Sequence, residues 1–184
     1  MDSGGRRLSA AAEGEVAQLK TGQMSDQATL LIMKPDAIRK GLIGATLSRL
    51  EALQLEIIGA KAVRVSRQLA REHYKFLREK PFFEELLDYL VGRLHGVNYV
   101  LAFVLWGPDA IERVRRMVGA THPEKADPAS IRGALGRMTA AGVMENVVHA
   151  SASPQEAQRE IALWFRSSEL LRQGTIPVRE VRRR

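Results

Sequence analysis

The order in which apolar runs and helical stretches alternate is the feature that most limits the fold of this chain. Four short runs have the composition of buried strands. They cover residues 29–33, 55–65, 97–106 and 146–148. Between and after them, apolar residues recur at helical spacing or follow helix-start signals. These helical stretches cover residues 42–54, 66–78, 81–90, 110–118 and 154–165.

Reduced to its core, this order is βαββαβ. It predicts an α+β protein of the ferredoxin-like plan, with helices packed on one face of a four-stranded antiparallel sheet. The run at residues 97–106 is the most hydrophobic, so we expect it to form a central strand. Many activities share this plan, so the fold by itself does not predict a function.

Composition places the chain among proteins with one packed domain. The chain has 184 residues, of which 45% are hydrophobic and 27% charged, as in ordinary globular proteins. It has no cysteine, which excludes disulfides and thiolate metal sites. No apolar run approaches the roughly 20 residues that a membrane-spanning helix needs. We therefore expect a cytoplasmic protein with no membrane partner.

The two ends differ in composition from the middle. Residues 1–26 are rich in Gly, Ser, Ala and Gln and predict a loose arm, in which Met24 is an alternative start. Residues 27–168 form the expected domain, and residues 169–184 a basic extension. The net charge of +7 is concentrated at that end. Such a tail is compatible with weak nucleic-acid binding, with free anions such as nucleotides, or with solvated charge alone.

The junction around His149 carries the strongest local signals. A short apolar run ends at this histidine, and a helix then starts with Ser153 as N-cap, Pro154 as first residue and Glu156 as third, a capping box. Free amides at a helix start favour anions. Glu160, one turn further on, is placed to hold one imidazole nitrogen, which would leave the other as a nucleophile. The alternative is a histidine that only ends a strand.

Several cationic residues lie at the ends of predicted elements. Lys34 follows the first apolar run, where Pro35 stops the strand, which is compatible with a surface role or a functional one. Arg115 lies nearest the edge of an apolar helical stripe, with Arg113 and Arg116 on the opposite side. An arginine there either binds an anion or packs its stem.

Residues 119–146 form a long connection with several prolines and glycines and two potential short helices. Connections of this length in a compact domain are uncommon and tend to be functional. This one contains Thr121 and Arg132 and leads directly into Asn146. We therefore interpret it as a binding loop.

Six ordered blocks resemble the nucleoside diphosphate kinases over about residues 29–165. The block around the histidine is Asn146-x-x-His149-Ala150-Ser151. The others are Ile32-Met33-Lys34-Pro35-Asp36, Glu72-His73-Tyr74, Pro81-Phe82-Phe83, Ile131-Arg132-Gly133 and Ile161-x-Leu163-Trp164-Phe165. One such block would be weak support, whereas six in order at near-family spacing are specific.

The resemblance implies a phosphotransferase that moves the γ-phosphate of a nucleoside triphosphate to a diphosphate. His149 would be the nucleophile, oriented by Glu160 and Ser151, and Mg²⁺ would arrive on the nucleotide phosphates. The remaining matched positions contact nucleotide in the family: Lys34, Asn146 and Thr121 at ribose and phosphates, Tyr74 beside them, Arg115 and Arg132 at the phosphates, and Phe82 under the base. Stacking on one ring predicts broad base specificity, with ATP and GTP among the substrates. Family members commonly form hexamers or tetramers, so we expect a homo-oligomer.

The chain departs from the family pattern at a few positions. Ala152 replaces the usual aspartate, and Ala37 the usual glycine. Residues 92–98 and 134–145 are longer than usual, and the second stretch comes just before Asn146. Two hypotheses compete with the active kinase: a non-catalytic regulatory module on the same scaffold, and a nucleic-acid-binding protein that uses the basic tail. Only the kinase explains the ordered blocks.

Overall fold

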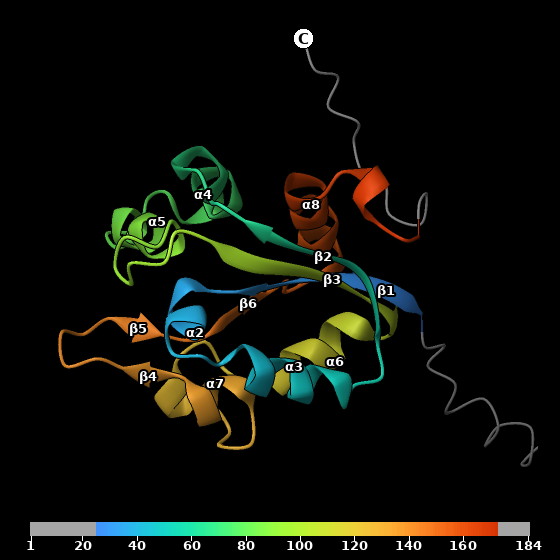
Figure 1. Cartoon of the computed structure of the whole chain (residues 1–184), viewed down its shortest axis with the longest axis horizontal. Coiled ribbons are helices and arrows are strands. Elements are labelled where there is room, and N and C mark those ends of the chain that lie inside the picture. The colour runs from blue at the N-terminus through green and yellow to red at the C-terminus, as the bar shows by residue number, and fades with distance from the viewer. Residues whose placement is uncertain (1–24, 173–184) are drawn as a thin grey trace, which may run out of the picture.

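The core of the protein is a four-stranded antiparallel sheet. The computed structural model describes residues 25–172, so most of the expected arm and basic extension lie outside the described residues. The strands stand in the order β2-β3-β1-β6, with every neighbouring pair antiparallel. Their bounds are β1 Asp26–Met33, β2 Glu56–Val63, β3 Val100–Pro108 and β6 Val148–Ala150. The predicted ferredoxin-like βαββαβ plan is confirmed (Figure 1).

Helices cover both faces of this sheet, so the prediction of helices on one face is wrong. On one face lie α2 Pro35–Arg39, α3 Ile43–Glu51, α6 Ala110–Val118 and α7 Ile131–Leu135, and on the other α4 Arg67–His73, α5 Phe83–Leu90 and α8 Pro154–Trp164 (Figure 1). Along β1, Leu30 and Ile32 join one buried cluster, whereas Leu31 and Met33 join the other. The unbroken apolar run of β1 reflects burial on both sides.

The predicted helix-start signals form as hydrogen bonds. Ser66 Oγ accepts from Leu69 N at 3.1 Å, and Ser153 Oγ accepts from Glu156 N at 3.2 Å. The Glu156 carboxylate, however, accepts from Ala152 N at 3.1 Å instead of closing the expected box on Ser153. The start of α8 is therefore tied to the residue that follows Ser151, which fixes where β6 gives way to the helix.

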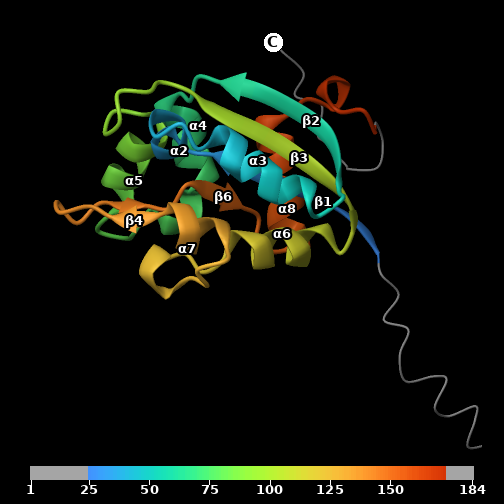
Figure 2. The ribbon, with the colours of Figure 1, turned by 60° about the horizontal axis from the view of Figure 1, so that its bottom comes forward.

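The long connection contains more structure than the sequence indicates. A short 3-10 helix, Pro123–Lys125, and α7 account for the two expected helices. A two-stranded hairpin follows, made of β4 Arg137–Met138 and β5 Met144–Glu145. The sequence does not reveal it, because strands of two residues carry no periodicity. Figure 2 shows this hairpin at one end of the molecule, next to α5.

The last described residues pack against the outer strand β2. Leu171 N donates to Ile58 O at 2.8 Å, and Leu170 lies so close to Gly59 that a Cβ there would come within 2.8 Å of its Cδ2. Glycine at position 59 thus allows the C-terminal segment to cross the sheet edge. Among the described helices, none has the length and apolar character needed to cross a bilayer.

Candidate functional site

A strained turn at residues 146–148 leads from β5 into β6 and lies against the end of β1. Val147 has φ +67°, which is unusual for a β-branched residue. Val148 N donates to Asn146 O at 2.7 Å, and this bond closes a three-residue γ-turn around Val147. The backbone of Lys34 donates to Val147 O at 2.9 Å, and the buried Asp36 carboxylate accepts from Val147 N at 3.0 Å. These contacts hold the strain in place beside the predicted site.

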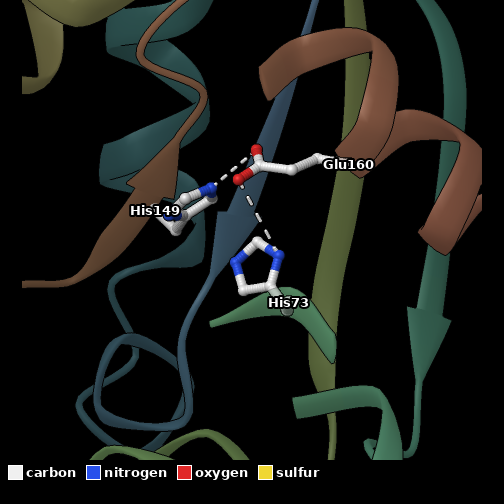
Figure 3. Close-up of side chains that lie close together, drawn as sticks. All are labelled: His73, His149 and Glu160. Carbon is white, nitrogen blue, oxygen red and sulfur yellow. Dashed lines mark hydrogen bonds and ion pairs between the residues drawn. The ribbon is translucent and has the colours of Figure 1, made fainter. Parts of the chain in front are cut away.

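Figure 3 shows the His149 ring from β6 directed at the carboxylate of Glu160 on α8. His149 Nε2 lies 2.9 Å from Glu160 Oε2, to which Ser151 Oγ also donates at 2.7 Å. Arg159 donates to the other oxygen at 3.3 Å. Burial raises the pKa of Glu160, but the hydrogen bonds from Ser151 and Arg159 to its two oxygens favour the carboxylate form, to which His149 donates through Nε2–H. This assignment leaves the lone pair on Nδ1.

The surroundings keep His149 uncharged. Burial lowers the pKa of His149 well below its ordinary value. Four nearby cations lower it further, in the order Lys34, Arg132, Arg159 and Arg115. A neutral imidazole at physiological pH is the form that can attack an electrophile.

His73 is a component of the site to which the sequence reasoning assigned no chemical role. Its ring lies edge-on to that of His149, with centroids 4.4 Å apart, and its Nδ1 accepts from Trp164 Nε1 at 3.2 Å. Burial lowers the pKa of His73 well below its ordinary value, so its 3.9 Å approach to Glu160 is not an ion pair at neutral pH. The one sequence feature that pointed to His73 was its position next to Tyr74 in the block Glu72-His73-Tyr74, which matches the family.

The same three side chains have the composition of a metal site. Ligand atoms of His73, His149 and Glu160 all lie within 4.8 Å of one another. The lone pair of His73 Nδ1 is already engaged by Trp164, however, and the cations around His149 oppose a metal ion. The arrangement fits hydrogen-bonded support of His149 better than cation binding.

Lys34 lies buried at the end of β1, next to the strained turn. Its Nζ donates to Asn146 Oδ1 at 2.6 Å, and Asn146 Nδ2 donates to the backbone oxygen of Thr121 at 3.0 Å. Burial, aided by the charge of Arg132, lowers the pKa of Lys34 to about 7. The amine is thus poised to gain a proton when an anion arrives.

Arg132 on α7 is held by backbone oxygens from two segments. Its two terminal nitrogens donate to Gly119 O at 3.0 Å and to Val148 O at 2.9 Å. Its Nε is buried with no acceptor among residues 25–172, and burial lowers its pKa to about 10. The next residue must be glycine, because a Cβ on Gly133 would lie 2.0 Å from Asp127 O. The binding loop is therefore locked against β6.

The remaining predicted site residues make no hydrogen bond to His149 or Glu160 among the described residues. Tyr74 is buried with its ring 6.1 Å from that of His149, whereas Phe82 is the N-cap of α5, with 49% of its surface exposed. Thr121 and Arg115 are exposed, and the Arg115 side chain makes no hydrogen bond within the described part of the chain. The expectation that Arg113 points away from the packed side is wrong, because it donates to Pro108 O at 3.1 Å and to Leu53 O.

The site therefore combines a neutral nucleophile with fixed positive charge. The bare Nδ1 of His149 has a carboxylate behind its ring, and Lys34 and Arg132 lie close enough to lower its pKa. Phosphoryl transfer depends mainly on positioning of the reacting groups and on cations that stabilise the charge on the phosphoryl oxygens. The geometry suits attack of an imidazole on a phosphoryl group.

Comparison with known proteins gives a consistent result. The family model described as nucleoside diphosphate kinase matches residues 27–170. A nucleoside diphosphate kinase from Pyrococcus horikoshii is 46% identical over 142 residues, which cover 77% of this chain and 87% of the relative. One from Thermus thermophilus is 45% identical over 143 residues, covering 78% and 98%.

Solved structures agree. The Borrelia burgdorferi nucleoside-diphosphate kinase, a transition-state mimic with bound vanadate and ADP, matches with a TM-score of 0.72 and 35% identity, covering 82% of this chain and 93% of that one. The Halobacterium salinarum enzyme in complex with CDP matches with a TM-score of 0.72 and 37% identity, covering 80% and 93%. The chain belongs to the nucleoside diphosphate kinase family.

Proposed function

We propose that this protein is a nucleoside diphosphate kinase that transfers the γ-phosphoryl group through a phosphohistidine on Nδ1 of His149. The observation that carries the proposal is the 2.9 Å contact between Glu160 Oε2 and His149 Nε2, which leaves Nδ1 as the available nucleophile. Family membership supports the reaction class, and the Borrelia relative binds ADP with vanadate in a transition-state mimic.

In the first half-reaction, the Nδ1 lone pair forms a bond to the γ-phosphorus while the bond to the bridging oxygen breaks. The nucleoside diphosphate leaves with that electron pair. The imidazole becomes cationic, and Glu160 stabilises it through Nε2–H. The second half-reaction reverses these steps with a different diphosphate. One site thus serves donor and acceptor in turn, with ping-pong kinetics.

The neighbouring cations would stabilise the charge that spreads over the phosphoryl oxygens. Lys34 is buried and Arg132 is half-buried, and Arg115 would approach from the exposed face of α6. Both oxygens of Glu160 are engaged by His149, Ser151 and Arg159, so this carboxylate is not offered to a metal ion. Mg²⁺ would therefore enter as part of the nucleotide substrate.

Phe82 would support any base by stacking, which gives broad specificity.

The direct test is to incubate the protein with γ-labelled ATP and Mg²⁺. We expect an acid-labile label on one histidine peptide, which moves to GTP when GDP is added. A protein that binds nucleotides but forms no acid-labile label would refute the proposed mechanism and favour the regulatory alternative.

Glu160→Gln should lower kcat by about 10²-fold or more, because a carboxamide permits the wrong imidazole tautomer. The amide N–H that this substitution introduces can donate to Nε2 of His149, which then leaves the proton on Nδ1. The measurement is single-turnover phosphorylation by ATP, with the thermal midpoint as a check on folding. A variant with normal rates would show that tautomer control is not needed.

The affinity for nucleotide should fall as pH rises above about 7, because Lys34 loses its proton there in the nucleotide-free protein. The sign follows from the lowered pKa: the ammonium form prevails below that pH and the neutral amine above it. Burial lowers the pKa of His149, so no matching loss is expected at mildly acidic pH. Calorimetry with ADP in buffers of different ionisation enthalpy should reveal proton uptake near neutrality. A pH-independent affinity would contradict this assignment.

The homo-oligomer, whether hexamer or tetramer, and the cytoplasmic location stay predictions, as does weak nucleic-acid binding by the basic tail. Truncation after Phe165 tests the nucleic-acid binding, because removal of the basic tail should abolish salt-sensitive binding of DNA or RNA. It would also remove Leu170, which packs against Gly59, so folding must be checked.

A further inference from the structure

The two stretches that are longer than the family pattern meet at one contact. His95 belongs to the first, residues 92–98, and Glu145 ends the second, residues 134–145. His95 Nε2 lies 3.1 Å from Glu145 Oε1, and both side chains are 7% exposed. Figures 1 and 2 both show the β4–β5 hairpin beside α5, from which residues 92–98 continue.

Glu145 is a firmly ionised anchor for this contact. Its second oxygen accepts from Arg137 Nε at 2.6 Å and from Lys40 Nζ at 3.2 Å. Burial alone would raise the pKa of Glu145, but the hydrogen bonds from Arg137, Lys40 and His95 outweigh it and hold the pKa at about 2. Since the carboxylate only accepts, His95 donates to it through Nε2–H.

Both partners of the bridge lead to Lys34. On one side, Glu145 is bonded through the peptide to Asn146, whose Oδ1 accepts from Lys34 Nζ at 2.6 Å. On the other side, His95 lies edge-on to Tyr89, with ring centroids 5.0 Å apart. Lys34 Nζ lies 5.2 Å from the centroid of that same Tyr89 ring. His95, Glu145, Asn146, Lys34 and Tyr89 therefore form a closed circuit of contacts. This circuit reaches the Lys34 ammonium group from two sides, through Asn146 and through Tyr89.

We propose that His95 and Glu145 are positioning residues, which hold the Lys34 ammonium where nucleotide phosphate binds. A lysine side chain has many rotamers, and fixing it before binding reduces the ordering cost that the ligand must meet. The longer stretches would thereby supply a support that acts on affinity without touching the nucleotide. This inference rests on the proposed function, because it assumes that Lys34 binds phosphate.

The test compares two substitutions at position 95. His95→Phe keeps a ring against Tyr89 but removes the donor, whereas His95→Gln keeps a donor for Glu145. The matched control is Arg93→Ala, which alters the same stretch by removing an exposed contact to Asp88 at 3.1 Å, outside the circuit. We expect His95→Phe to raise the dissociation constant for ADP by about five- to tenfold. His95→Gln should recover most of this affinity, and Arg93→Ala should leave it unchanged.

A double-mutant cycle with Lys34→Met separates positioning from general loosening. If the bridge acts through Lys34, His95→Phe should have little further effect on ADP affinity in the Lys34→Met background. An equal loss in both backgrounds would overturn the inference. Should His95→Phe fail to fold, Glu145→Gln, which keeps the shape but removes the charge, enters the same cycle.

The inference and the proposed function fail in different ways. A wild-type protein that forms no phosphohistidine would refute the function. A wild-type protein that transfers phosphate normally, together with a folded His95→Phe variant of unchanged ADP affinity, would refute only the positioning role.

Discussion

Replacing His149 with alanine is expected to lower phosphotransfer by at least about 10⁴-fold, because no other described group can take over as nucleophile. The neighbouring His73 cannot substitute, since its Nδ1 lone pair accepts from Trp164 and its ring is fully buried. The measurement is the initial rate of GTP formation from ATP and GDP, alongside the acid-labile label. Both should disappear together.

His122→Gln provides the matched histidine control. His122 is the N-cap of the 3-10 helix Pro123–Lys125, and the described contacts of the His149 ring are with Glu160, His73 and Tyr74 instead. The control should retain the label, and both variants should unfold near the wild-type temperature. A label that survives in His149→Ala would move the nucleophile to another residue and invalidate the assignment.

The second large effect is expected at Arg132. Arg132→Met should reduce kcat/KM by about 10³-fold, because the half-buried guanidinium would stabilise charge on the transferring phosphoryl group. The loss should appear mainly in kcat if the contact strengthens in the transition state. Pre-steady-state phosphorylation by ATP measures this step without product release.

Arg132 also ties two backbone segments together, so its substitution needs a control for structure. Arg132→Lys keeps the positive charge and loses the two-pronged contact with Gly119 O and Val148 O. If the charge matters most, the lysine variant should be clearly faster than the methionine variant at similar stability. Arg116→Met, which removes only an exposed pair with Glu112, should match wild type. Equal losses in both Arg132 variants would indicate a purely structural role.

Much of the fold could be predicted from local patterns. The apolar runs at β1 and β3 and the cap at Ser153 have local physical causes, and the structure has them where expected. The helices themselves were predicted, but not that they cover both faces, although the unbroken apolar run Leu30–Leu31–Ile32–Met33 already required cover on both sides. The error came from using the element order and neglecting this burial signal.

The functional site likewise has features that local sequence patterns predict and features that they do not. The pairing of His149 with Glu160 was predicted from spacing, because both residues flank one capped helix start. His73 and the buried Asp36 escaped notice as contributors, since their contacts with Trp164 and Val147 join segments distant in sequence. The β4–β5 hairpin was missed because its strands are too short to show a pattern. Contacts of this kind depend on tertiary packing, which local patterns do not encode.

The left-handed turn at Val147 limits where residues can be inserted into this chain. Side chains alternate along a strand, so one residue added between Asn146 and His149 would rotate the imidazole onto the opposite side of the sheet. The exposed tip at Ala140, Ala141 and Gly142 carries no such constraint, because a Cβ on Gly142 would meet nothing within 4 Å. A peptide tag or reporter inserted at that tip should leave catalysis intact, whereas a single alanine inserted before His149 should silence the enzyme.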